Sequence, residues 1–464
     1  MNQVEKFDVV VIGAGPGGYV AAIRAAQLGL KVAIVEKNQL GGICLNWGCI
    51  PTKALLSSAS VLRSLRHAKD YGISVQGISV DLSNVVERSR KVAKQLQNGV
   101  QHLMKKNNVT VFQGIAYIQG EGSIVITQDT RKQTLYARHI VVATGASARV
   151  LDTFPMGKEG VWYYKDALMP ECLPKKLLVI GAGAIGVEFA CFYHDMGVDV
   201  TLIEAGGSIL PAEDGEVSAY MQNVLSKDGI HLHVGTMVKR AEYQEGKWNI
   251  TLDNNEESVI QVDKVLVAIG VVGNIQQIGL ENTKVEVKHS FICTDDFGAT
   301  AEKGIYAIGD VAGAPCLAHK AYHQAVKCIE KIAGKTPKAL DFGRIPACTY
   351  SYPQVAHIGM TEEVVKQKGI SYRIGKFPFS ANGKAIAAGA TEGFVKVIFE
   401  RNTGELLGAH MVGHDVTEML QGYGIAMSLE TTEQELMETI FAHPTQSEAM
   451  HEAVLAAFGQ ALHT

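Results

Sequence analysis

Two stretches of the chain share one order of apolar and polar positions. Residues 6–37 and 176–205 each begin with an apolar, β-branched run, continue through a glycine-rich turn into a stretch with helical spacing, and end in a second apolar run. Each stretch therefore predicts a strand, a turn, a helix and a strand, the unit of a doubly wound sheet. An acid closes both copies at the same distance, because Glu36 follows Gly13 by 36 − 13 = 23 positions and Glu204 follows Gly181 by 204 − 181 = 23.

The turns of both copies, GAGPGG and GAGAIG, have the glycine spacing of dinucleotide-binding units. The first two glycines allow the turn and the approach of a pyrophosphate, and the third lets the helix pack on the strand. The helix N-terminus supplies N–H groups and positive dipole to the phosphates. Glu36 and Glu204 would accept hydrogen bonds from ribose hydroxyls, and Glu204 would repel a 2′-phosphate, which favours NAD over NADP in the second unit. The other interpretation is a pair of ordinary turns in βαβ packing.

Three further apolar runs end in small-residue turns, as strands of a doubly wound domain do at their ligand. RHIVVATGASAR places Thr144 and Gly145 at such a turn, and DKVLVAIGVVGN places Gly270 there. KGIYAIGDVAG places Asp310 at the carboxyl end of a strand. This acid would bind a ribityl or ribose hydroxyl, or it would cap the following helix.

The pattern changes from about residue 346. VKVIFERNTGELLGAHMVG predicts a hairpin that turns at 402–404, followed by helices over 418–430 and 447–462, so this part forms a separate α+β unit. His443 precedes the last helix and Glu448 lies five positions on. The two side chains would form a proton-transfer pair, or they are the polar start of a helix.

Composition and charge narrow the function classes. A chain of 464 residues corresponds to about three domains, and 48 glycines with only 19% charged residues favour an α/β enzyme that binds a cofactor. A net charge of −4 argues against nucleic acid and anionic membrane as partners. No apolar stretch reaches about 18 residues, so no membrane span is expected. Glu5, Lys6 and Asp8 precede the first apolar run, unlike a signal peptide, which predicts a cytoplasmic protein.

Two cysteines, Cys44 and Cys49 in GGICLNWGCIPTK, lie just downstream of the first glycine turn. On a regular helix, five positions separate the Cα atoms by more than roughly 7 Å, beyond ordinary disulfide reach, so the chain near Gly48 must distort if the thiols pair. Pro51 marks a helix start, where thiolates are stabilised. Two buried free cysteines in a loop are the other interpretation. The spacing of the other cysteines does not resemble that of a zinc site, so no metal is expected. These six cysteines are expected to be small buried apolar groups: Cys172, Cys191, Cys293, Cys316, Cys328 and Cys348.

Taken in order, GAGPGG, GGICLNWGCIPTK, VVATG, GAGAIGVE, AIGD and HPTQSE resemble the flavin-dependent pyridine nucleotide disulfide oxidoreductases over essentially the whole chain. The resemblance implies an α/β fold with two doubly wound, Rossmann-like domains, for FAD and NAD, and a C-terminal α+β dimerisation domain. The expected domains are an FAD-binding domain over 1–148, an NAD-binding domain over 149–275, a central domain over 276–345 and an interface domain over 346–464.

The resemblance also implies roles for individual residues. Cys44 would exchange with substrate sulfur, Cys49 would face the flavin, and His443, oriented by Glu448, would be the base that serves the disulfide of the other subunit in a homodimer. Lys53 and Glu188 would pair near the flavin ring. The residues expected at FAD are Gly13, Gly15, Gly18, Glu36, Lys53, Gly114, Thr144, Gly145, Asp310 and Ala318, and those expected at NAD are Gly181, Gly183, Gly186, Glu204 and Gly270.

The activity that the resemblance implies is oxidation of protein-bound dihydrolipoamide to lipoamide with reduction of NAD+. The partners would be lipoyl domains of a 2-oxo acid dehydrogenase acyltransferase or of a glycine cleavage carrier. Departures at Ile43, Trp47 and Gln446 leave the fit of the dithiol open. Glutathione-type reductases are disfavoured because no arginine follows LIE in the second unit, and mercuric reductases because the tail lacks a cysteine pair. A similar transhydrogenase would lack the redox cysteines. A reductase of another dithiol and a noncatalytic flavoprotein scaffold remain the alternatives.

Overall fold

The structure is a computed structural model that describes residues 5–253 and 258–463. Residues 1–4 lie outside these ranges. They begin the N-terminal segment that, from its sequence, is not expected to be a signal peptide. Two compact units make up the chain: unit 1 consists of Met1–Leu55, Asp81–Arg149 and Gly270–Leu340, and unit 2 of Leu56–Val80, Val150–Ile269 and Asp341–Thr464. The predicted domain boundaries after residues 148, 275 and 345 remain predictions. No helix in the described ranges is long and apolar enough to cross a membrane.

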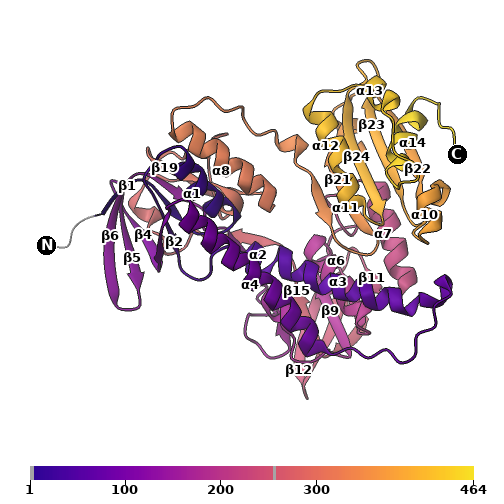
Figure 1. Cartoon of the computed structure of the whole chain (residues 1–464). Helices are drawn as coiled ribbons and strands as arrows, with labels where there is room; N and C mark the ends of the chain where they lie inside the picture. Colours follow the sequence, from indigo (N-terminus) through magenta and orange to yellow (C-terminus); the bar gives the residue numbers. More distant parts are fainter. Residues whose placement is uncertain (1–4, 254–257, 464) are drawn as a thin grey trace. The chain divides into compact units, whose positions relative to one another are not determined.

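Unit 1 is built on a sheet with the strand order β3-β2-β1-β6-β5-β4 and with β19 beside β6 (Figure 1). Strand β6 is shared, since its first half pairs antiparallel with β5 and its second half lies in parallel between β1 and β19. Val9, Val10 and Val11 of β1 are completely buried, as expected for the centre of a sheet covered on both faces. The strands are β1 (Glu5–Ile12), β2 (Val32–Glu36), β3 (Thr110–Gln113), β4 (Ile115–Gly120), β5 (Ser123–Gln128), β6 (Arg131–Val142) and β19 (Ile305–Ala307).

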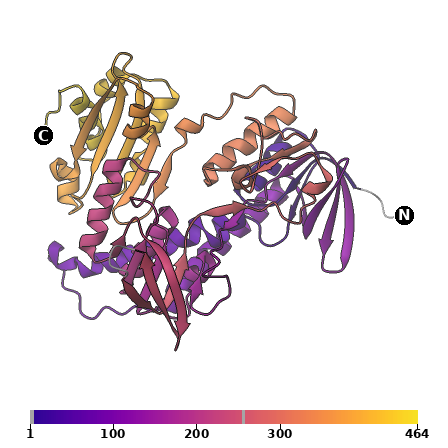
Figure 2. The same ribbon diagram turned by 180° about the vertical axis from the view of Figure 1, so that it is seen from behind.

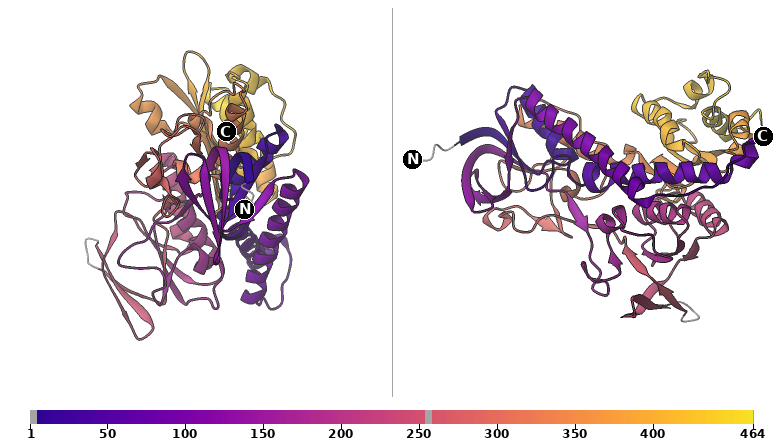
Figure 3. Two further views of the ribbon diagram at one scale, coloured as in Figure 1. Left: turned by 90° about the vertical axis from the view of Figure 1, so that its left-hand side faces the viewer. Right: turned by 60° about the horizontal axis from the view of Figure 1, so that its bottom comes forward.

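Helices α1 (Pro16–Gln27) and α8 (Ala318–Ile332) pack against each other in unit 1. Ala21, Ala22 and Ala25 of α1 are fully buried, so small side chains let the helix approach its neighbours closely. The long helix α4 (Leu82–Lys106) lies beside α1 and α2 (Figure 3). The remaining elements of unit 1 are α2 (Gly42–Trp47), α3 (Cys49–Arg66, which continues into unit 2), β7 (Ala146–Ala148), β16 (Val271–Gly273), β17 (Val287–Lys288), β18 (Phe291–Ile292), η2 (Leu280–Asn282) and η3 (Gly309–Ala312).

Unit 2 contains a second parallel sheet, with the order β11-β10-β9-β15-β8, and an antiparallel sheet β12-β13-β14. The order β11-β10-β9-β15-β8 corresponds strand for strand to β3-β2-β1-β6-β19, which confirms the predicted repeat. The elements are β8 (Val161–Trp162), β9 (Lys176–Ile180), β10 (Asp199–Ile203), β11 (His231–His233), β12 (Met237–Gln244), β13 (Lys247–Asp253), β14 (Val259–Val262), β15 (Lys264–Val267), α5 (Tyr164–Leu168), α6 (Ala184–Asp195), α7 (Gly215–Asp228) and η1 (Ala68–Tyr71).

The C-terminal part of unit 2 is an antiparallel sheet with the order β20-β21-β24-β23-β22, and α14 packs on β22 and β23 (Figure 2). Strands β23 and β24 form the hairpin predicted to turn at 402–404, which is confirmed. The elements are β20 (Ala347–Thr349), β21 (Gln354–Gly359), β22 (Tyr372–Pro378), β23 (Phe394–Glu400), β24 (Leu406–Gly413), α9 (Glu362–Gln367), α10 (Gly383–Ala387), α11 (Val416–Met419), α12 (Gln421–Ser428), α13 (Glu433–Glu438), α14 (Glu448–Ala457), η4 (Phe342–Arg344) and η5 (Phe379–Ala381).

The two predicted C-terminal helices have different limits in the structure. The helix expected over 418–430 is divided at Leu420 into α11 and α12, in a stretch whose glycines Gly422 and Gly424 weaken helix formation. The helix expected over 447–462 ends at Ala457, and Gly459 adopts a positive φ of 69° shortly after it. Such a glycine is a common helix stop that the apolar spacing of the tail conceals.

Burial of the other cysteines was overestimated from the sequence. Cys191 and Cys328 are buried, but Cys172 and Cys316 are exposed, so the expectation is wrong for these two. Cys172 lies in the loop between α5 and β9, and Cys316 lies in the loop between η3 and α8. A loop on the surface exposes even an apolar side chain, and the sequence pattern does not distinguish such a loop from a buried turn.

Substitution of glycine by alanine should have opposite effects at Gly18, where helix and strand pack closely at the first glycine turn, and at Gly99, where the helix surface is open. At Gly18 a Cβ would lie 1.9 Å from the carbonyl oxygen of Gly13, whereas at Gly99, exposed within α4, it would meet nothing within 4 Å. We expect Gly18→Ala to lower the thermal midpoint by several degrees, and Gly99→Ala to raise the free energy of unfolding by about 0.5–1 kcal/mol. Thermal melts followed by circular dichroism test both, and an unchanged midpoint for Gly18→Ala would contradict this packing.

Candidate active site

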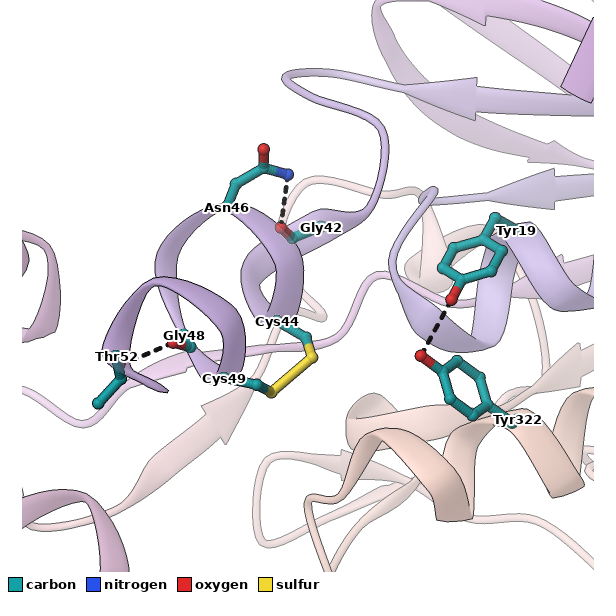
Figure 4. The surroundings of a disulfide bond; sticks show 8 residues. All are labelled: Tyr19, Gly42, Cys44, Asn46, Gly48, Cys49, Thr52 and Tyr322. Carbon is teal, nitrogen blue, oxygen red and sulfur yellow. Dashed lines mark hydrogen bonds between the residues drawn. A yellow bond between two sulfur atoms is a disulfide. The ribbon is translucent and has the colours of Figure 1, made fainter. Parts of the chain in front are cut away.

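The two cysteines near the first glycine turn form a disulfide (Figure 4). Helix α2 ends at Trp47, Gly48 leaves the helical conformation with φ −144° and ψ −113°, and α3 begins at Cys49. This interruption brings the Cα atoms of Cys44 and Cys49 to 4.7 Å, so the predicted distortion at Gly48 is confirmed.

Hydrogen bonds to main-chain carbonyls hold both sides of the break. The carbonyl of Gly48 accepts from the Thr52 N–H at 3.1 Å and from the Thr52 hydroxyl at 2.7 Å. On the other side, the side-chain amide of Asn46 donates to the carbonyl of Gly42 at 2.9 Å (Figure 4). One main-chain carbonyl on each side of the disulfide, at Gly42 and at Gly48, therefore has a side-chain donor.

Trp47, the departure between the two cysteines, has a partner on α4. The guanidinium of Arg90 lies 4.8 Å from the centre of the Trp47 ring and donates to the carbonyl of Asn46 at 2.7 Å. Burial lowers the pKa of Arg90, so this guanidinium is desolvated where it contacts the ring. Cation–π contacts strengthen when desolvated, and the pair therefore fastens the end of α2 to α4.

Near-identical contacts surround the glycines of the two dinucleotide turns. A Cβ on Gly13 would lie 2.4 Å from the carbonyl oxygen of Ala143, and one on Gly181 would lie 2.5 Å from that of Ala268. The third glycine of the second copy, Gly186, would clash with the Gly181 carbonyl oxygen at 1.9 Å, the same distance as for Gly18 in the first copy. In both turns only glycine allows helix and strand to approach this closely.

The helices after both turns start without a side-chain cap. Gly15 is the N-cap of α1 and Gly183 is the N-cap of α6, with nearly equal backbone angles (φ −70° and −72°). The first-turn N–H groups of an uncapped helix are available to an anion, and the positive end of the helix dipole favours one. Both turns therefore have the groups that a pyrophosphate needs.

The acids at the ends of the second strands are held in one way in both copies. The carboxylate of Glu36 accepts from the N–H groups of Ala14 at 2.8 Å and Asn38 at 2.7 Å. The carboxylate of Glu204 accepts from Ala182 at 2.8 Å and Gly206 at 2.7 Å. Each carboxylate is thus fixed beside its glycine turn, with acceptor capacity left for a ribose hydroxyl.

Asn274, which the sequence did not point to, organises the turn after β6. The side-chain amide of Asn274 donates to the main-chain carbonyl of Thr144 at 2.9 Å, and the main-chain carbonyl of Asn274 accepts from the Thr144 hydroxyl at 2.7 Å. A Cβ on Gly145 or on Gly270 would meet nothing within 4 Å, so both backbones border open space. The only sequence signal for Asn274 is its place directly after the run VVG, which forms β16.

The other residues expected at the cofactors lie on several elements. Lys53 is in the first turns of α3, and Gly114 follows β3, where its N–H donates to the carbonyl of Glu36 at 2.9 Å. Ala318 is the first residue of α8. Glu188 is buried in α6, and its carboxylate accepts from the N–H of Tyr350 at 2.9 Å. The pairing of Lys53 with Glu188 remains a prediction.

Asp310 is part of η3 and is not a helix cap. The N-cap of η3 is Ile308 and that of α8 is Leu317, so the capping alternative for Asp310 is wrong. Burial raises the pKa of Asp310, and the nearby ammonium of Lys320 opposes that effect. A further pair missed from the sequence is Tyr19 and Tyr322, whose hydroxyls are 2.9 Å apart in the surroundings of the disulfide (Figure 4).

His443 and Glu448 are hydrogen bonded at the start of α14. Nδ1 of His443 lies 2.9 Å from the Glu448 carboxylate, whose other oxygen accepts from the N–H of Thr445 at 2.8 Å. The histidine side chain is 77% exposed. Burial acts to raise the pKa of Glu448, but the hydrogen bonds from Thr445 and His443 outweigh it and leave the pKa below its ordinary value. The arrangement leaves Nε2 of the imidazole to exchange a proton.

The residues of both turns fit a dinucleotide. A Cβ on Gly183 would meet nothing within 4 Å, and one on Gly15 would meet only the Cα of Gly42 at 3.8 Å, so a phosphate can approach either backbone. Uncapped helix starts and fixed carboxylates supply the donors and acceptors that pyrophosphate and ribose require. Among the described residues, no group of three or more His, Cys, Asp and Glu side chains would hold a metal ion.

Known relatives resemble the chain over nearly its full length. A dihydrolipoyl dehydrogenase of Zymomonas mobilis is 50% identical, with 99% of this chain and 100% of that protein covered. One of Rhizobium etli is 49% identical over the same shares, and one of Bacillus subtilis is 42% identical over 99% of each chain.

Solved structures show the same fold. LpdA of Mycobacterium tuberculosis aligns with a TM-score of 0.91 at 24% identity, covering 97% of this chain and 99% of that chain. The flavoprotein disulfide reductase RclA of Escherichia coli aligns with a TM-score of 0.88 at 26% identity over the same shares. Residues 7–325 match the model of the pyridine nucleotide-disulphide oxidoreductases, and residues 345–454 match that of their dimerisation domain. The chain belongs to the pyridine nucleotide-disulphide oxidoreductase family.

Proposed function

We propose that Cys44 and Cys49 are the redox pair with which the chain oxidises dihydrolipoyl groups. The chain is a dihydrolipoyl-oxidising enzyme of the disulfide oxidoreductase family that works with FAD and NAD, as its full-length relatives are. The observation that carries the assignment of the residues is the Cys44–Cys49 disulfide, which lies at a helix start in the unit that contains the first dinucleotide turn. Both cysteines are partly exposed, and thiol–disulfide exchange requires such access of the attacking thiolate to sulfur.

His443 starts the reaction in this proposal by taking the proton of one substrate thiol at Nε2. Glu448 holds Nδ1, which fixes the tautomer that leaves Nε2 as the acceptor, and its carboxylate stabilises the imidazolium that forms. Because the pKa of Glu448 is lowered, its carboxylate is ionised at neutral pH and loses this charge only as the pH falls through that lowered value.

Two exchanges then transfer the electron pair from substrate to protein. The substrate thiolate attacks Sγ of Cys44, which forms a mixed disulfide, breaks the Cys44–Cys49 bond and releases Cys49 as a thiolate. His443 then releases the first proton to solvent and takes the proton of the second substrate thiol. The thiolate so formed attacks the substrate sulfur of the mixed disulfide, which closes the cyclic disulfide of the product and releases Cys44 as a thiolate. His443 returns its proton to Cys44. The substrate is oxidised by two electrons and the protein disulfide is reduced by the same two.

The start of α3 favours the thiolate form of Cys49, because a helix N-terminus stabilises a nearby negative charge. The chemistry that bound FAD supplies is transfer of the electron pair from the dithiol to NAD+ as hydride. Gly13, Gly15, Gly18 and Glu36 would hold the pyrophosphate and ribose of FAD. In the second unit the corresponding residues would hold NAD, with Glu204 turned against a 2′-phosphate.

The working form in this proposal is a homodimer, for which the matched dimerisation domain is the support. His443 of one chain would serve the Cys44–Cys49 disulfide of the other, so a separated monomer would lack activity. The protein partners would be lipoyl domains of a 2-oxo acid dehydrogenase acyltransferase or of a glycine cleavage carrier. The exposure of the His443 side chain leaves this base open to a dithiol that another protein carries.

Replacing Cys49 with serine tests the electron route. We expect Cys49→Ser to keep FAD bound and to lose dihydrolipoamide-dependent NADH formation by at least about 10³-fold, because no disulfide remains to accept electrons. NADH absorbance measures the rate and bound flavin absorbance measures cofactor content. Cys172→Ser, at an exposed free cysteine, is the matched control and should have the wild-type rate. Full turnover by Cys49→Ser would exclude this function and favour a scaffold.

His443→Gln tests the base, with His463→Gln as its matched control. Both histidines bond a glutamate of α14 through Nδ1, His443 at 2.9 Å to Glu448 and His463 at 2.7 Å to Glu452. We expect His443→Gln to lower kcat for dihydrolipoamide by about 10²- to 10⁴-fold, the usual contribution of a general base, while NADH still reduces the disulfide at the wild-type rate. Equal effects of the two variants on dihydrolipoamide oxidation would contradict the assignment of His443.

A further inference from the structure

A lysine ammonium is buried between α8 and the turn that carries Asp310. The Lys320 side chain, third in α8, is 1% exposed. Its Nζ donates to the carbonyls of Gly309 at 3.1 Å and Gly313 at 2.6 Å. These two glycines lie on either side of residues 310–312, so one ammonium holds both ends of η3.

The surroundings of Lys320 disfavour a positive charge, so a neighbouring negative group would explain why a cation stands there. Burial removes an ammonium from water, which lowers the pKa of Lys320, and the first turn of a helix repels positive charge through the helix dipole. An uncharged side chain of similar length would avoid both effects. The negative group that the ammonium affects is Asp310. Burial raises the pKa of this carboxyl, and the charge of Lys320 offsets part of that rise.

The same helix makes a second attachment to this turn. The side-chain carbonyl of Gln324, one helical turn after Lys320, accepts from the N–H of Gly309 at 2.9 Å. Gly309 and Gly313 both have positive φ, 74° and 98°, a conformation that non-glycine residues rarely adopt. The backbone of η3 is therefore shaped to present its carbonyls to Lys320 and its N–H to Gln324, while Asp310 is held within the turn.

We propose that Lys320 is a positioning residue of the FAD site: its ammonium fixes both ends of η3 and so holds the Asp310 carboxylate where it would accept a hydrogen bond from a ribityl hydroxyl of FAD. The inference rests on the role proposed above for Asp310. Lys320 does not touch the cofactor in this account and acts through Asp310. A lysine that served only to fill the core would have no such link to one carboxylate.

A double-mutant cycle on the holoenzyme tests the proposal. FAD affinity and the rate of FAD release after dilution, followed by flavin fluorescence, are measured for wild type, Lys320→Met, Asp310→Asn and the double variant. We expect Lys320→Met to weaken FAD by about 10- to 100-fold, as for a lost hydrogen bond to a charged group. In the Asp310→Asn background the same change should weaken FAD by less than about 3-fold, because the carboxylate it serves is gone. Equal factors in both backgrounds would overturn the proposal.

The pH profile of FAD affinity gives a readout that a purely structural lysine would not change. Without Lys320, nothing opposes the effect of burial on Asp310, so the pKa of this carboxyl rises further. As the pH is lowered, FAD affinity should therefore begin to fall at a higher pH in Lys320→Met than in the wild type, and identical profiles would contradict the link between Lys320 and Asp310. Cys316 also interacts with Asp310 and Lys320. It is neutral below pH 8 because partial desolvation and the Asp310 carboxylate raise its pKa to about 11.

Lys327→Met, on the same helix, is the control for loss of a lysine and should bind FAD as the wild type does. Its Nζ donates to the carbonyl of Lys338, away from η3. If wild type oxidises dihydrolipoamide and Lys320→Met binds FAD with unchanged affinity, the role of Lys320 is refuted and the proposed function stands. If wild type fails with dihydrolipoamide while Lys320 and Asp310 are coupled in FAD binding, the proposed function is refuted and the role of Lys320 stands.

Discussion

The end of helix α2 at Gly48 is the constraint on which the chemistry of this protein depends. Cysteines five positions apart on one straight helix cannot bond, because the helical rise alone separates them too far. Ending one helix at Trp47 and starting the next at Cys49 brings the Cα atoms to 4.7 Å and allows the disulfide. The same break places Cys49 at a helix start, so one backbone feature provides both the bond and a site that favours its thiolate.

The chain contains two copies of one nucleotide-binding design, the first in the unit that holds the disulfide and the second in the other unit. Both copies use a glycine that approaches a neighbouring strand, a second glycine that starts an uncapped helix, and a glutamate fixed by two N–H groups. Because the two copies share their contacts as well as their sequence pattern, the spacing of their glycines and of the closing glutamate is set by backbone packing. Held carboxylates such as Glu36 and Glu204 would need little rearrangement to receive a ribose in the role proposed for them, and this would reduce the entropy lost on binding.

Much of this could be predicted from the sequence, because strands, glycine turns and the distance to the closing acid are local patterns. The hairpin of β23 and β24 and the distortion at Gly48 followed from such rules. Contacts between distant segments could not be predicted: Asn274 reaches Thr144, and the exposure of Cys172 depends on where its loop lies. Lys320 in a helical stretch looks like a surface residue, and only packing against η3 shows that it is buried.

The central claim is that the sulfurs at positions 44 and 49 carry electrons between a dithiol and NAD. The most direct measurement is mass-spectrometric labelling of thiols in the anaerobic holoenzyme before and after one equivalent of dihydrolipoamide, and again after excess NAD+. We expect label to appear at Cys44 and Cys49 on reduction and to be absent from both once NAD+ has been added. Label that stays away from these two positions, or that NAD+ leaves unchanged, would contradict it.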